Sequence, residues 1–419
     1  MKALFVSLIL PFALMLTACG KADTVWLDTP VVREAPFEPS TAVDENQRLN
    51  EQFNPQLEII FVIDNSMSME AHITKLSNNI DRFVDGFTKN TPFRYNVAVM
   101  SVYDHRRFKG EKFQAAHGGT DLEFDIGEFR TVKDSSGNEI PGKLFISSTD
   151  DDVAGKLKKT LKIGVQDLIG AGPEVEETFS PLAAAYGVGD IHQSAAVRNK
   201  QSSFFMGDDS YKVFFFVTDA SDNSLISASD LYTSLLAKTA NPSKIMGFGA
   251  ISKNGCKRDP GKKNSELDDF LQLTRPNPNT QNVVSLCSNF GDRFASFGKE
   301  IRKQVLSQTI PLTKGIPDLN QVATSEVHSG SADADAECMK PVSERDPKTL
   351  VVCYGTQRIF LRTTKSGPRG YRFNPDTNRI RLDEGFQFDE SQQGASLIAV
   401  YHPIHVESRE KGNVKAWGQ

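Results

Sequence analysis

The chain has 419 residues, which is too long for one ordinary domain of roughly 150 residues, so we expect two or three folded units. Hydrophobic residues make up 39% and charged residues 24% of the chain, and these ordinary globular values exclude wholesale disorder. The chain has 48 basic and 53 acidic residues and a formal net charge of −5, so no basic excess indicates binding to nucleic acid or attraction to anionic lipid.

The N-terminus has the pattern of an export signal. A short basic start precedes an apolar run over residues 3–15, which is shorter than the roughly 20 residues that span a membrane. The next residues, Leu-Thr-Ala-Cys ending at Cys19, resemble the bacterial lipobox. This resemblance implies a signal peptide over residues 1–18, a lipid on Cys19 and, because Gly20 rather than Asp follows, sorting to the outer membrane. An ordinary secretory signal with a chance cysteine is the alternative.

A polar stretch with three prolines and no sustained periodicity follows, and it predicts a tether over residues 19–54. After it, apolar β-rich runs alternate with segments whose apolar residues recur every three or four positions. The runs are typical of strands buried on both faces of a parallel sheet, and the periodic segments are typical of amphipathic helices. The expected strands are 57–63, 95–102, 211–218, 244–251 and 283–286, and the expected helices are 70–88, 153–168, 178–186, 227–238, 267–273 and 289–306.

Interleaved strands and helices over residues 55–306 predict an α/β domain with a doubly wound, mostly parallel sheet, which binds ligands at the carboxyl ends of its strands. Residues 103–150 break the alternation with turn signals, so we expect a hairpin-bearing insertion there. Short alternating runs separated by turn residues then predict an all-β sandwich over residues 307–406, followed by a tail over residues 407–419. The expected sandwich strands are 357–362, 371–373, 379–382 and 396–401.

Oxygen-bearing side chains follow two of the expected parallel strands. Asp64, Ser66 and Ser68 form the pattern Asp-x-Ser-x-Ser directly after the first buried strand, and Asp219 follows the most apolar one. Hard oxygens at alternate positions of a loop suit Mg²⁺, which prefers about six oxygen ligands. The same residue types also end strands and cap helices, which is the alternative interpretation.

These residues resemble the metal-ion-dependent adhesion site (MIDAS) of von Willebrand factor type A domains, and the resemblance covers about residues 55–306. It implies that the Asp-x-Ser-x-Ser side chains bind a metal ion and that Asp219 reaches the ion through water. The family's threonine position falls on Glu176, with Thr178 two residues later. A carboxylate at this position would raise the affinity for a divalent ion and weaken the pull of the bound ion on an acidic partner. Whether Glu176 or Thr178 completes the site stays open.

The resemblance implies a binding function. A divalent cation, Mg²⁺ foremost with Mn²⁺ or Ca²⁺ as alternatives, would join the site to an acidic residue of a partner protein. The alternative is a structural or assembly lipoprotein of the envelope, whose type A domain packs on its partners without metal dependence. The sequence has no complete Gly-x-x-x-x-Gly-Lys-Ser/Thr phosphate loop, no Gly-x-Ser-x-Gly elbow and no His-Glu-x-x-His helix, so nothing in it favours an enzyme.

Four of the five cysteines are expected to form disulfides, because Cys19 carries lipid in the lipobox interpretation and disulfides persist in exported proteins. The closing strands resemble those of exported bacterial type A proteins with an appended sandwich, in which two cysteines recur at the positions of Cys256 and Cys287. Four cysteines allow three pairings. We favour Cys256 with Cys287 and Cys338 with Cys353, because each pair then lies in one predicted domain and closes a modest loop worth roughly 3 kcal/mol.

Overall fold

The computed structural model describes residues 49–89, 91, 93–104, 126–162, 176–239, 241–252, 265–276, 280–288, 290–307, 309–312, 317, 336–345, 350–360, 370–374, 378–383, 386, 388–392 and 395–401. All of them belong to one compact unit, Phe37–Gln419. The predicted signal peptide and Cys19 lie outside the described residues, as do most of the tether and the predicted tail. Of the helices in the described ranges, none is long and apolar enough to cross a membrane.

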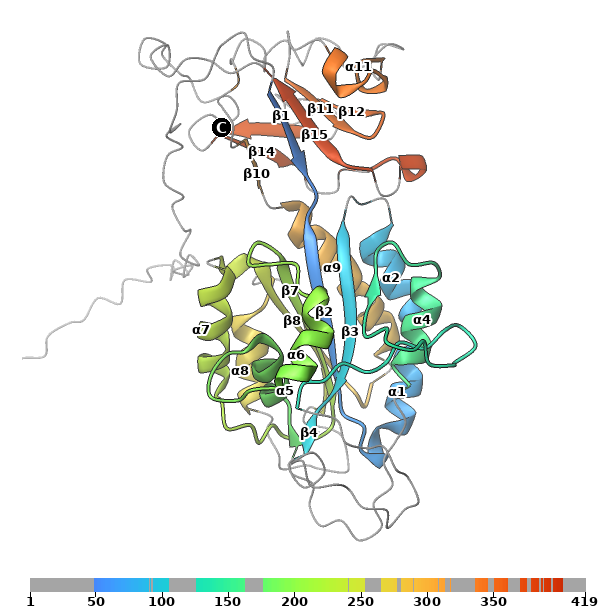
Figure 1. Cartoon of the computed structure of the whole chain (residues 1–419), viewed down its shortest axis with the longest axis vertical. Helices are drawn as coiled ribbons and strands as arrows, with labels where there is room; N and C mark the ends of the chain where they lie inside the picture. The colour runs from blue at the N-terminus through green and yellow to red at the C-terminus, as the bar shows by residue number, and fades with distance from the viewer. Residues whose placement is uncertain are drawn as a thin grey trace, which may run out of the picture. The chain divides into compact units, whose positions relative to one another are not determined.

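A six-stranded sheet with the strand order β5-β3-β2-β7-β8-β9 forms the centre of the α/β domain (Figure 1). Every neighbouring pair is parallel except β3 with the short edge strand β5. This arrangement confirms the predicted fold class, an α/β domain with a mostly parallel sheet. The strands are β2 Gln56–Ile63, β3 Arg94–Ser101, β5 Ile146–Ser147, β7 Tyr211–Thr218, β8 Ile245–Ile251 and β9 Val283–Ser285.

Helices pack on both faces of this sheet, which is why its central strands are apolar almost throughout (Figure 1). Phenylalanines fill the interface between the sheet and the helices that include α2. Phe61 stacks on Phe215 with 4.7 Å between ring centroids, and Phe83 packs edge-on against both rings. One face carries α1 Glu70–Ser77, α2 Ile80–Thr88, α4 Val153–Thr160 and α9 Gly291–Ser307, and the other carries α5 Phe179–Tyr186, α7 Ala228–Thr239 and α8 Ser265–Leu273.

Two predicted helices differ from the observed ones. The helix expected over 70–88 is two helices, α1 and α2, which are separated at Asn78 and Asn79. The side chain of Asn79 donates a hydrogen bond to a carbonyl one turn earlier at 2.9 Å, and such local bonds compete with helix continuation. Helix α4 ends eight residues before the end expected for 153–168, and residues 163–168 lie outside the described residues.

The predicted insertion at 103–150 contains an antiparallel bridge between Lys133 and Glu139. The backbone N–H of Asp134 donates to the carbonyl of Asn138 at 2.8 Å inside this turn. At the start of the insertion, β4 Tyr103–Asp104 pairs with β6 Glu176–Glu177 as a separate two-stranded sheet. Strand β6 ends two residues before α5 begins, so its pairing with β4 fixes the chain where it enters that helix.

Two antiparallel sheets with the strand orders β1-β15-β11-β12 and β10-β14-β13 make up the C-terminal part. Their facing side chains share one core, which includes the fully buried Tyr354, Tyr371 and Tyr401. The elements are β1 Leu49–Phe53, β10 Thr309–Pro311, α11 Ala336–Met339, β11 Val351–Tyr354, β12 Gln357–Ile359, β13 Tyr371–Asn374, β14 Arg379–Leu382 and β15 Leu397–Tyr401.

Strand β1 comes from the end of the segment predicted as a tether, 19–54. It pairs antiparallel with β15, from Leu49 opposite Tyr401 to Phe53 opposite Leu397. A strand of five residues has little signal of its own, and this one depends on a partner near the other end of the chain. The α/β domain is therefore inserted in sequence between the first strand of the sandwich and the remaining ones.

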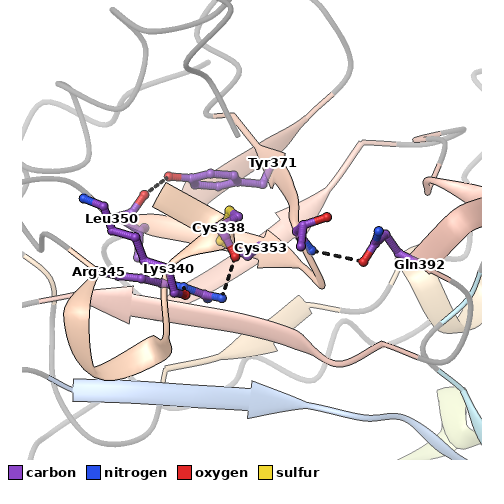
Figure 2. Close-up of a disulfide and its surroundings, with 8 residues drawn as sticks. Cys338, Lys340, Arg345, Leu350, Cys353, Tyr371 and Gln392 are labelled. Carbon is purple, nitrogen blue, oxygen red and sulfur yellow. Dashed lines mark hydrogen bonds between the residues drawn. A yellow bond between two sulfur atoms is a disulfide. The ribbon is translucent and has the colours of Figure 1, made fainter. Parts of the chain in front are cut away.

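The disulfide between Cys338 and Cys353 joins α11 to β11, which confirms the predicted pairing (Figure 2). Both cysteines are buried, and the guanidinium of Arg345 donates to the carbonyl of Cys338 at 3.0 Å. Cys287 is also disulfide-bonded, and its predicted partner, Cys256, lies outside the described residues.

Candidate metal centre

Asp64 lies directly after β2, at the edge where the central parallel strands end. Its backbone N–H donates to the carbonyl of Val217 at 2.9 Å, which extends the pairing of β2 with β7 by one residue. The side chain is fully buried. Its Oδ1 accepts a hydrogen bond from the N–H of Ser66 and its Oδ2 accepts one from the hydroxyl of Thr218, both at 2.8 Å. The carboxylate is therefore fixed in one orientation by its own loop and by the neighbouring strand.

Ser66 and Ser68 bring two hydroxyl groups to the same loop. Ser66 is buried and extended, and a short 3₁₀ turn, Met67–Met69, then carries the exposed Ser68. The two Oγ atoms are 3.0 Å apart. Neighbouring ligands in an octahedron with metal–oxygen distances of about 2.1 Å are separated by about 3.0 Å. The spacing of these hydroxyls therefore fits two ligand positions around Mg²⁺.

Asp219 follows β7 and brings a second carboxylate to this edge, where it lies close to the side chain of Ser68. Burial raises the pKa of Asp219, and the negative charge of Asp64 raises it further. The side chain of Ser68 and the nearby His72 partly oppose this shift in pKa. The ionised carboxylate is thus disfavoured where it lies, and a cation beside it would reverse this effect.

Glu176 and Thr178, the two alternatives for completing the site, lie on the loop before α5. The carbonyl of Glu176 accepts a hydrogen bond from the N–H of Asn223 at 2.8 Å, and the N–H of Thr178 donates to Oδ1 of Asp222 at 2.6 Å. Both Glu176 and Thr178 are buried. The structure thus attaches this loop to the loop that carries Asp219. Hydrogen bonds join Asp64, Ser66 and Ser68 in sequence, and Asp219 lies close to them at the same edge.

Several residues that hold these loops in place were not predicted from the sequence. Thr218 orients Asp64, while Asp222 and Ser224 accept hydrogen bonds from backbone N–H groups in the first turn of α5. Burial raises the pKa of Asp222, and the hydrogen bond from the N–H of Thr178 opposes the shift. These side chains cap α5 from another loop. Their only sequence signal is that Asp222-Asn223-Ser224 repeats the Asp-x-Ser spacing.

Ser180 was also missed. It is fully buried in the first turn of α5, and its N–H donates to the hydroxyl of Ser224 at 3.1 Å. Its own hydroxyl oxygen has no hydrogen-bond partner in the part of the chain that the structure describes. Buried polar atoms are rarely left unsatisfied, so this hydroxyl is a further candidate for an oxygen ligand.

The side chains at this edge suit a hard divalent cation. In the described ranges, no three Asp, Glu, His or Cys side chains form a group that could hold a metal ion by themselves. The residues that lie together at this edge instead supply two carboxylates and two serine hydroxyls, all of which are oxygen ligands. Oxygen donors of this kind fit Mg²⁺, Mn²⁺ or Ca²⁺ better than they fit softer metals.

No protein-family model matches the chain, and no curated protein matches it. Proximal thread matrix protein 1 from the mussel byssus is similar in structure, with 14% identity and a TM-score of 0.31 over 61% of this chain and 48% of that chain. The same mussel protein with a zinc-occupied MIDAS motif gives 12% identity and a TM-score of 0.28 over 60% of this chain and 48% of that chain. The pilus adhesin SpaC from Lactobacillus rhamnosus GG is 12% identical to this chain and gives a TM-score of 0.29 over 84% of this chain and 40% of that chain. The chain spans less than half the length of each of these proteins, and such weak likenesses carry no argument about its function.

Proposed function

We propose that this protein binds partner proteins through a divalent cation held at the carboxyl edge of its parallel sheet. The observation that carries the proposal is the placement of Asp64 and Asp219. These carboxylates follow neighbouring strands, and the charge of Asp64 raises the pKa of Asp219. Such a pair is unfavourable alone and becomes favourable with a cation between its members.

Asp64, Ser66 and Ser68 would hold the ion, with Asp219 bound to it directly or through water. Glu176 or Thr178 remains the expected further ligand from the neighbouring loop. Mg²⁺ is our first choice, because the serine oxygens have the spacing that its octahedral geometry requires. When bound, the cation supplies an electrophilic position for a carboxylate of the partner protein. Ser68 is exposed, so a partner can reach this part of the site from solvent.

We further propose that the protein works in the cell envelope, anchored in the outer membrane by a lipid on Cys19. The lipobox-like sequence supports this location. The disulfide between Cys338 and Cys353 supports an oxidising compartment, in which such bonds persist. In this proposal the protein is a binding protein and not an enzyme, and neither its charge nor its motifs favour nucleic acid as a partner.

Thermal unfolding of the full chain tests the metal site. We expect Mg²⁺ to raise the unfolding midpoint of the native protein relative to EDTA, because a ligand present at a hundredfold excess over its Kd stabilises a protein by about 2.7 kcal/mol. Asp64→Asn keeps the shape of the side chain but removes its charge, so this variant should show no such rise. Asp85→Asn changes an exposed carboxylate of α2 and should respond as the native protein does. A native midpoint that is equal in Mg²⁺ and EDTA contradicts the proposal.

Retention of partner proteins separates the two candidate roles. Envelope and surface extracts are passed over the immobilised native chain in Mg²⁺, and the column is then washed with EDTA. A metal-dependent binding protein should release its partners into EDTA, and Asp64→Asn should not retain them. Envelope proteins that both chains retain through the EDTA wash would instead support the structural or assembly role.

A further inference from the structure

Leu225 is one of three large hydrophobic side chains that are exposed in the described part of the chain. It is 90% exposed, compared with 69% for Met339 and 45% for Leu273. Met339 and Leu273 end α11 and α8, whereas Leu225 lies on the loop that leaves β7, six positions after Asp219. The most exposed large apolar side chain among the described residues therefore shares a loop with the candidate metal centre.

The loop around Leu225 is anchored on both sides. Before it, the hydroxyl of Ser224 accepts hydrogen bonds from two N–H groups of α5, at 2.9 and 3.1 Å. After it, the half-buried Ile226 packs against the core, and the N–H of Ala228 donates to the carboxylate of Glu266 at 3.0 Å. These contacts fix the chain on either side of Leu225, so the fold itself holds this side chain in solvent.

A single exposed leucine is common on protein surfaces and by itself indicates nothing. Leu225 differs in its position and in the rigidity of its loop. A side chain on an anchored loop lets a partner bury apolar surface without the further cost of ordering that loop. Protein interfaces commonly place such apolar contacts beside a charged or polar recognition group.

We propose that Leu225 is an apolar contact for the partner protein and selects acidic segments that carry a large apolar residue next to the carboxylate. This inference rests on the proposed function, since the cation would bind the carboxylate while Leu225 packs against the neighbouring side chain. It adds a requirement that the metal site cannot impose, because the cation attracts any accessible carboxylate. Acidic segments with only polar neighbours would therefore bind more weakly.

The test uses an array of N-acetylated hexapeptide amides with a fixed central Asp and varied neighbours, probed with the full chain in Mg²⁺. We expect the native protein to bind peptides with Leu, Ile, Val or Phe beside the Asp about fivefold to tenfold more strongly than the matching Ser peptides. EDTA should abolish both signals. Leu225→Ser should bind both classes at the lower level, and Leu273→Ser, an exposed leucine of α8, should keep the native preference.

The outcomes separate this inference from the proposed function. Mg²⁺-dependent binding without an apolar preference, or a preference that survives in Leu225→Ser, overturns the role of Leu225 and leaves the metal site standing. If no peptide of the array binds in a Mg²⁺-dependent way, both proposals fail. The rise in unfolding midpoint with Mg²⁺ should be the same in Leu225→Ser as in the native protein, which distinguishes a lost partner contact from a damaged metal site.

Discussion

The two ends of the central strands β2 and β7 differ in the charges that surround their carboxylates. At the amino end, Glu58 of β2 lies opposite Lys212 of β7, with 3.3 Å between Oε2 and Nζ and with both side chains buried. At the carboxyl end, Asp64 and Asp219 bring two negative charges together, and the pKa of Asp219 is raised. Glu58 also accepts hydrogen bonds from Tyr186 at 2.9 Å, from Met206 at 2.7 Å and from Ser210 at 2.6 Å.

This difference suggests one role for each end of the pair of strands: stability at the amino end and, in the proposed function, binding at the carboxyl end. The charge of Glu58 is balanced by a residue of the chain itself, so the amino end is complete on folding. The charges of Asp64 and Asp219 oppose each other, so in the proposed function a bound cation would stabilise the carboxyl end. We therefore expect substitutions at the amino end to change stability in any buffer, and those at the carboxyl end to depend on the metal.

Lys212→Met should have the largest effect. It leaves the carboxylate of Glu58 buried without its counter-charge, and breaking a buried ion pair in this way typically costs about 3–5 kcal/mol. The free energy of unfolding, measured in urea with EDTA present, should fall by this amount. Adding Glu58→Gln to Lys212→Met removes the unpaired charge and should recover part of the loss. If Lys212→Met has the same urea midpoint as the native protein, the ion pair at the amino end does not stabilise the fold.

Tyr186→Phe tests the amino end through pH. Burial raises the pKa of Tyr186 well above its usual value, and the charge of Glu58 raises it further. A tyrosine in the unfolded chain ionises near pH 10, so above about pH 10 the unfolded state loses a proton that the folded state keeps. This residue should therefore lower the free energy of unfolding by about 1.4 kcal/mol for each pH unit above that value.

Without the hydroxyl, Glu58 keeps its other hydrogen-bond donors, so Tyr186→Phe should lose only about 1 kcal/mol at neutral pH. Its free energy of unfolding should then fall less steeply than that of the native protein in alkaline solution. Urea unfolding of both proteins between pH 8 and about pH 11 measures the two slopes. Equal slopes would mean that the hydroxyl of Tyr186 ionises as easily in the folded chain as in the unfolded one.

The parallel strands and the carboxyl edge could be predicted from the sequence because each depends on a strong local signal. Strands β2 and β7 are apolar apart from Glu58, Lys212 and the polar residues at their ends, since both of their faces are covered by helices. Asp64 and Asp219 directly follow these strands, and the carboxyl ends of neighbouring parallel strands meet at one edge. Their placement at the same edge of the sheet therefore follows from the parallel arrangement of the strands.

The other features depend on contacts between distant segments, which have no local signal. Glu58 and Lys212 meet only because β2 and β7 pair in one particular register. Asp222 caps α5 because two loops that are far apart in sequence lie against each other. Strand β1 is polar and short, and it forms through its pairing with β15. The sequence therefore predicts the layers and the edge of the site, but not the side chains that hold the two loops together.

Asp219→Asn has the smallest expected effect, and its sign should depend on the metal. In EDTA, burial and the charge of Asp64 raise the pKa of Asp219, so ionising this side chain is less favourable in the folded state than in the unfolded chain. A neutral asparagine should therefore increase the free energy of unfolding by about 1 kcal/mol or less. The stability of the native protein in EDTA should also fall as the pH rises from the usual aspartate range through the raised pKa, and the variant should lose this part of the pH dependence.

In Mg²⁺ the native protein should have the larger free energy of unfolding, because the variant offers the cation one carboxylate fewer and gains less stability from it. Urea unfolding of both proteins in EDTA and in Mg²⁺ measures all four free energies, and Asp85→Asn serves as the control for removing an exposed charge. A variant that is less stable than the native protein in both buffers would show that the carboxylate of Asp219 supports the fold itself. A reversal would show that the carboxylate of Asp219 destabilises the metal-free protein and stabilises the metal-bound one. The paired charges at the amino end, by contrast, stabilise the protein whether or not metal is present.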